Sequence, residues 1–137
     1  MKSKQVLSIE QMKYLQELGL DTGDASMHWQ YLPTADAIIN GTDEIEKEPT
    51  LFVSQPNMKH EYPAYTLQDI LDKLPPIIDE VYWLTLEVMD KQKNEWKIKY
   101  ALINAEHECE SFSSEKLIDV AYEMLCWCIE KGYIKTN

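Results

Sequence analysis

The sequence is poor in the residues on which several classes of protein depend. Only 13 of its 137 residues are basic, against 24 acidic ones, and the formal net charge is −11. Affinity for nucleic acids rests largely on Lys and Arg, and the basic residues here form no cluster, so we expect no direct binding to nucleic acid or to an anionic membrane. The charge is compatible with a basic protein partner, with imitation of a nucleic acid's charge, or with solubility alone.

Cysteine, glycine and long apolar runs are also scarce. The three cysteines are odd in number and suggest no disulfide framework, which favours a reducing cytoplasm. The four glycines form no phosphate-cradling loop. No segment approaches the roughly 20 apolar residues that cross a bilayer, and the first residues lack the apolar run of a signal peptide. We therefore expect a cytoplasmic protein with no membrane segment and no cofactor.

Length and apolar content fit a single domain over residues 1–137. A chain of this size buries roughly two-thirds of its unfolded surface, enough for one core. The apolar fraction of 45% and the charged fraction of 27% are those of an ordinary globular protein. No repeat or shift in composition marks a domain boundary.

Capping residues mark the start of three helices. Ser8 is a good N-cap with Gln11 in the capping-box position, and Gly19 follows the helical run. Thr66 opens a second helix with Asp69 in the reciprocal position. A third helix is expected from Ser113 or Ser114 to Lys131, ended by Gly132.

The segment between the first two helices is harder to assign. Met27–Leu32 and Thr50–Ser54 have the composition of strands, and a further strand is expected at Ala35–Asn40. Gly41–Pro49 carries four carboxylates and is most simply a solvated loop, with an acidic docking loop as the functional alternative.

Period-two alternation runs through three successive segments, at Tyr82–Met89, Trp96–Ile103 and Glu106–Ser111. This pattern predicts an antiparallel meander. With residues 91–95 and 104–105 as the connections, Lys99 is expected between Glu87 and Glu110 on the outer face, where opposite charges stabilise the pairing.

These elements predict an α+β fold in which an antiparallel sheet, including the three-stranded meander, packs with three helices. The expected order is one helix, three strands, a second helix, the three strands of the meander and a last helix.

Candidate metal and catalytic groups are few. Glu106, Glu108 and Glu110 share one strand face, but a straight strand spreads them apart, which favours surface charges paired with lysines over a cation site. His107 and Cys109 share the other face, and the remaining ligands of a zinc site are missing.

Nucleophilic catalysis by Cys109 with His28 or His60 stays open, because sequence does not show whether they meet. No oxyanion or nucleophile-elbow motif accompanies them. We therefore expect no catalytic or metal-binding residue.

Aromatic residues outside the expected core are the candidate interaction surface. On a helical wheel Trp127 falls among charged residues, so either another segment of the chain covers it or a partner does. Trp83 is expected on the outer face of the meander beside Met89 and Ile103. If that face is open, these residues form an apolar patch large enough for binding.

Several segments resemble small uncharacterised proteins of phages and mobile elements of gut bacteria. The resemblance is carried by YTLQDIL at 65–71 with LP after it, by residues 115–136, by Leu7–Gly19 and by Ala25–Trp29, together about half the chain. It implies a bacterial cytoplasm and an accessory or phage-borne gene, and it transfers no activity and no site residue.

Three hypotheses follow for the function. The preferred one is a non-catalytic protein that binds an unknown host or phage protein, for which a basic surface would suit the acidic chain. The alternatives are a small metal-dependent or Cys/His hydrolase using His107 and nearby carboxylates, and a structural homo-oligomer that packs through its outer sheet face.

Overall fold

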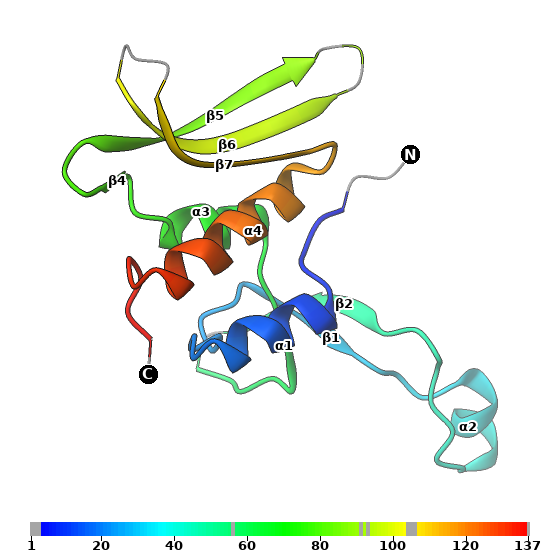
Figure 1. The fold of residues 1–137 in the computed structure, drawn as a ribbon. Coiled ribbons are helices and arrows are strands. Elements are labelled where there is room, and N and C mark those ends of the chain that lie inside the picture. Colours follow the sequence, from blue (N-terminus) through cyan, green and yellow to red (C-terminus); the bar gives the residue numbers. More distant parts are fainter. Residues whose placement is uncertain (1–3, 56, 91, 93, 104–106, 137) are drawn as a thin grey trace.

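The computed structural model describes residues 4–136 except 56, 91, 93 and 104–106. Within that part of the chain, four helices and two antiparallel sheets confirm the α+β fold (Figure 1). The helices are α1 (Ile9–Glu17), α2 (Ala35–Asn40), α3 (Leu67–Lys73) and α4 (Leu117–Glu130). The strands are β1 (Met27–Gln30), β2 (Thr50–Val53), β3 (Tyr62–Ala64), β4 (Ile77–Ile78), β5 (Tyr82–Asp90), β6 (Glu95–Leu102) and β7 (Glu108–Ser114).

The meander is confirmed, with the short strand β4 added at its edge in the order β4-β5-β6-β7. Helix α4 contacts β6 and β7, and we call the face that it covers the inner face of this sheet (Figure 1). Ile98 and Tyr100 point to that face and are completely buried. Because side chains alternate along a strand, Lys97 and Lys99 lie on the opposite, outer face.

The register of the meander differs in detail from the expected one. Lys99 Nζ lies 3.2 Å from Glu87 Oε1, as expected, but its second acidic neighbour is Glu108 at 3.7 Å rather than Glu110. The cause is a β-bulge, in which Cys109 is an extra residue between the partners of Tyr100 and Ala101. The bulge places Glu110 opposite the buried Tyr100, so Glu108 and Glu110 do not share one row.

The second sheet contains three strands in the order β2-β1-β3, with both outer strands antiparallel to β1. It is separate from the meander, so the chain has two sheets where one was expected. Helix α1 contacts β3, and the Trp29 indole donates a hydrogen bond to the carbonyl of Leu7, 3.2 Å away. These contacts fix one face of the sheet to the body of the molecule.

The capping predictions hold for α1 and α3. Ser8 with Gln11 and Thr66 with Asp69 both form reciprocal capping boxes. The predicted cap of α4 is wrong, because β7 extends through Ser114 and the N-cap is Lys116, whose side chain makes no capping bond.

The segment Ala35–Asn40 is the helix α2, and its assignment as a strand is wrong. Thr34 Oγ1 accepts a hydrogen bond from the backbone amide of Ala37, 3.0 Å away, and Gly41 ends the helix in the left-handed region at φ 69°. Threonine at the N-cap and glycine at the C-terminal end are strong local signals. Here they override the strand preference of two adjacent isoleucines.

One hydrophobic core joins α1, α3 and α4 to the inner face of the meander. Its largest fully buried side chains include Tyr65, Tyr100, Leu7, Met12, Leu15, Ile70, Ile98, Met124 and Leu125. Helix α4 is buried on most of its circumference, because the meander lies on one side of it and α3 on another (Figure 1). In the described part of the chain, no helix has the length and apolarity to cross a membrane.

Candidate functional site

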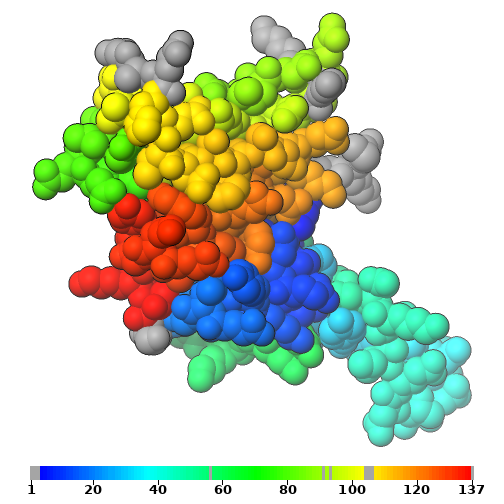
Figure 2. Space-filling model, viewed as in Figure 1, coloured from blue at the N-terminus to red at the C-terminus, as the bar shows by residue number. Residues whose placement is uncertain are grey.

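A projecting arm, residues 31–49, is the most exposed part of the described chain. It contains α2 and stands away from the body (Figures 1 and 2). Two backbone hydrogen bonds close its base, from Thr34 N to Glu44 O at 3.1 Å and from Glu46 N to Leu32 O at 2.8 Å. The arm is therefore tied at its base by paired backbone.

The arm presents apolar side chains to solvent. Ile38 is 71% exposed, Ile39 is 77% exposed and Ile45 is 55% exposed. Single exposed apolar residues are common, but here two adjacent isoleucines on a six-residue helix leave most of their surface in solvent. Ala37 is the buried residue of α2.

The arm that carries these isoleucines is also rich in carboxylates. Five acidic residues against one lysine give the arm a strong negative charge; they are Asp36, Asp43, Glu44, Glu46 and Glu48, with Lys47 as the base. None of the five takes part in an ion pair within the described residues. Acidic residues that do form ion pairs lie elsewhere in the fold, as in the pair Lys97–Glu108 at 2.6 Å.

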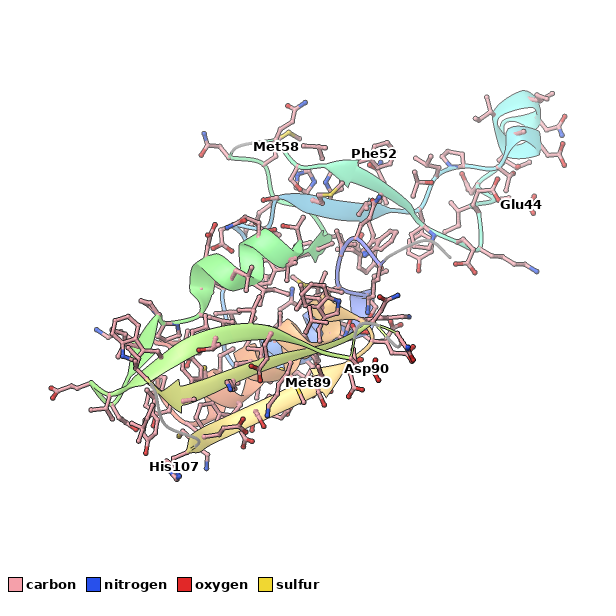
Figure 3. The ribbon with its side chains drawn as sticks, turned by 90° about the horizontal axis from the view of Figure 1, so that it is seen from above. Glu44, Phe52, Met58, Met89, Asp90 and His107 are labelled. Atoms are coloured by element: carbon pink, nitrogen blue, oxygen red, sulfur yellow. The ribbon has the colours of Figure 1, made fainter. Side chains whose placement is uncertain are left out.

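Strand β2 leads from the arm and forms an edge of the three-stranded sheet. Val53 is 74% exposed and Phe52 is 36% exposed. Figure 3 shows Phe52 and Met58 on the side of this sheet that faces away from the body, with the labelled Glu44 farther out on the arm.

A pair of stacked histidines connects β1 to the segment that joins β2 to β3. This segment, residues 54–61, has to cross over β1 because β2 and β3 flank β1. The rings of His28 in β1 and His60 in the crossover lie nearly parallel, with centroids 3.6 Å apart. Phe52 stacks on His28 at 5.8 Å, and Ser54 Oγ lies 3.0 Å from His28 Nδ1.

Burial controls the chemistry of this pair. His28 is only 8% exposed, and desolvation together with the neighbouring His60 lowers its pKa below the ordinary value. His28 is therefore neutral at pH 7 and can accept or donate one hydrogen bond to Ser54. His60, which stacks on His28, has a buried Nε2 with no hydrogen-bond partner among the described residues. A hydrolytic dyad uses a carboxylate or amide to orient its imidazole.

A pocket of about 870 Å³ opens beside this pair. Six of its thirteen lining residues carry aromatic rings, and Tyr31 and Tyr62 meet edge to face at 5.7 Å. Its lining combines the base of the arm, the edge strand and the crossover, through Ile45, Phe52, Val53, Met58, His60 and Tyr62. The exposed arm and the edge strand therefore border one concave surface.

The structure does not bring the four expected interaction residues together. Trp83, 43% exposed, lies on the outer face between Ile77 and Ala101 in the cross-strand rows. Ile103 is 55% exposed just beyond the end of β6. Met89 is six residues from Trp83 along β5, or roughly 20 Å, and Figure 3 shows it at the end of the meander remote from His107.

Trp127 is covered by the chain itself. Its ring lies 6.2 Å from that of Tyr100 and 5.5 Å from that of Tyr133, and the side chain is half-buried against the core. Tyr133 is held in place by a hydrogen bond from its hydroxyl to Asp79 at 2.7 Å. Trp127 belongs to α4 on the inner side of the meander, whereas Trp83 lies on the outer face.

The remaining candidate groups for catalysis are scattered. Cys109 is in the bulge of β7, where burial and the charges of Asp79 and Glu110 raise its pKa, which disfavours the thiolate. His107 lies beside Tyr82 of the meander, while His28 belongs to β1 of the other sheet and His60 to the crossover between β2 and β3. No group of three metal-binding side chains occurs in the described residues, and Glu106 lies outside them.

Two features of this surface, the helix in the arm and the histidine pair, are not among the elements predicted from the sequence. The helix in the arm has a readable signal, Thr34 before the run and Gly41 after it. The histidine pair has none, because His28 and His60 meet only through the crossover.

No protein-family model, curated protein or solved structure matches this chain.

Proposed function

We propose that this protein is a non-catalytic binding protein whose projecting arm engages a basic protein partner. The observation that carries the proposal is the exposure of Ile38 and Ile39 on a short helix held away from the body. Such side chains bury apolar area only when something else covers them, and each Å² covered contributes roughly 25 cal/mol.

The charge of the arm supports the choice of partner. The arm carries five carboxylates and one lysine, and this net negative charge repels an acidic surface and attracts a basic one. Following the resemblance to phage and mobile-element proteins, we place the encounter in a bacterial cytoplasm, with a host or phage protein as partner.

The test is capture of partners from a bacterial lysate by the immobilised protein, with the double variant Ile38→Ser/Ile39→Ser as comparison. We expect a protein with a basic surface to be enriched by the native chain, less so at moderate salt, because rim charges are screened. The double variant should not enrich it. Equal recovery by both proteins would contradict the proposal.

A homo-oligomer is the second candidate, favoured by the outer face of the meander. Trp83 and its cross-strand neighbour Ile77 are exposed apolar residues there, and Ile103, just beyond the end of β6, and Val81, just before β5, are 55% and 49% exposed. We expect light scattering to show a larger species at high concentration if this face is an interface between copies, and Trp83→Ser to restore the monomer. A monomer at all concentrations would remove this candidate.

A further inference from the structure

The edge of β2 carries unpaired backbone groups. Ser54 N donates to Ser26 O at 2.9 Å, and hydrogen-bonded positions alternate along an antiparallel pair. The main-chain groups of Phe52 therefore point to β1, and those of Leu51 and Val53 point away from it. No described strand pairs with β2 on that side.

Both sides of this edge offer contacts for an added strand. Phe52 and the pocket lie on one face, and Val53, 74% exposed, points to the other face by the alternation of the strand while also bordering the pocket. The crossover leaves β2 over the face that carries His28, so it does not run along the open edge (Figure 3). A strand added here would place alternate side chains on the two faces.

Charge decides which strand fits. The arm enters β2 directly, and Glu46 and Glu48 are exposed just before Thr50. The basic residues that offset part of this charge are Lys47 and, in the pocket lining, Lys59. A second copy pairing through the same edge would bring two acidic arms together on chains of net charge −11 each, which is unfavourable. A basic segment gains from the same field.

We infer that β2 binds an extended segment of its partner, with basic and apolar residues in alternation, as a fourth strand beside β2-β1-β3. This inference rests on the proposed function and specifies the partner segment and its mode of binding. Main-chain hydrogen bonds would come from Leu51 and Val53, apolar contacts from Phe52 and Ile45, and charge contacts from the arm.

The probe is a short synthetic peptide of alternating lysine and valine, titrated against the full chain at low salt. Val53→Pro removes the outward amide and leaves the bonds to β1 intact, since proline is tolerated on edge strands. Val53→Ala is the matched control, because it shortens the side chain and keeps the amide. A peptide that is N-methylated at alternate residues tests the same bonds with the native chain, whether or not Val53→Pro folds.

We expect the native chain and Val53→Ala to bind the peptide with affinities within about threefold of each other. Val53→Pro, or N-methylation of the peptide, should lower the affinity by at least about tenfold, because each removes main-chain hydrogen bonds and not only a side-chain contact. Binding should slow hydrogen exchange at the amides of Leu51 and Val53. Absence of peptide binding, or binding that is indifferent to N-methylation, would overturn strand addition. Partner capture that still depends on Ile38 and Ile39 would then leave the proposed function standing.

Discussion

The imidazole rings of His28 and His60 lie parallel at 3.6 Å and join two segments that are 32 residues apart. This contact holds the crossover segment onto the face of β1, next to the pocket and behind the edge strand β2. The geometry of the candidate binding surface therefore depends on a contact buried beneath it.

Replacement of His60 by alanine should loosen this crossover. Aromatic pairs contribute about 0.5–1.5 kcal/mol beyond the area they bury, so we expect the free energy of unfolding to fall by about 1 kcal/mol. Hydrogen exchange should quicken in residues 54–61. His107→Ala, in the other sheet, is the matched control and should change neither quantity. Equal effects of the two substitutions would contradict a specific role for the stack.

The depressed pKa of His28 predicts a pH dependence of stability. In the unfolded chain this histidine takes up a proton near its ordinary value of about 6.5, whereas in the fold burial and His60 hold its pKa lower. The unfolded state therefore binds more protons between these two values. Stability is fully present above about pH 6.5 and is lost as pH falls toward the folded pKa.

Urea unfolding between pH 7.5 and pH 5 measures this loss, since carboxylates remain largely ionised over that range. His28→Gln keeps a hydrogen-bonding group near Ser54 and removes the titration, so its stability should be flatter over the same range. A native chain whose stability does not change there would contradict the burial of a neutral His28.

Substitution of Trp127 and of Trp83 should lower the free energy of unfolding by very different amounts. Trp127 packs on Tyr100 and Tyr133, so Trp127→Ala should lower the free energy of unfolding by about 2–4 kcal/mol. Trp83 is 43% exposed, and Trp83→Ala should lower it by less than about 1 kcal/mol. Chemical denaturation measures both. A larger effect at Trp83 would show that the outer face is covered in solution.

Asp69 links α3 to the start of β1 as well as capping its own helix. Its carboxylate accepts from Thr66 N and Ser26 N, both at 3.0 Å, and from Ser26 Oγ at 2.5 Å. Asp69→Ala should therefore lower stability by about 1–3 kcal/mol. Asp72→Ala, on the exposed side of the same helix, should stay within about 0.5 kcal/mol. Indistinguishable melting curves for the two variants would contradict the link.

Local signals predicted the elements whose cause is local. The capping boxes at Ser8 and Thr66 and the alternation of the meander all appear in the structure, because a few adjacent residues determine them. Local signals also mark the ends of α2, with Thr34 as its N-cap and Gly41 as its C-cap. There the chain follows these caps and not the strand preference of the two β-branched isoleucines.

Features that depend on distant segments could not be predicted. The bulge at Cys109 moves Glu110 out of the row expected for it, and a single strand carries no mark of such an insertion. The cover over Trp127 comes from Tyr133, beyond the end of its helix. The short strands β3 and β4 exist because neighbouring strands pair with them, and neither has a periodicity of its own.

Partner capture tests directly whether the arm is the binding surface of this protein. The native chain, Ile38→Ser/Ile39→Ser and Trp83→Ser should be immobilised at equal density and exposed to the same bacterial lysate, with all three shown to be folded. We expect the native chain and Trp83→Ser to bind a basic protein that the arm variant does not bind. A partner retained by the arm variant and lost by Trp83→Ser would contradict it.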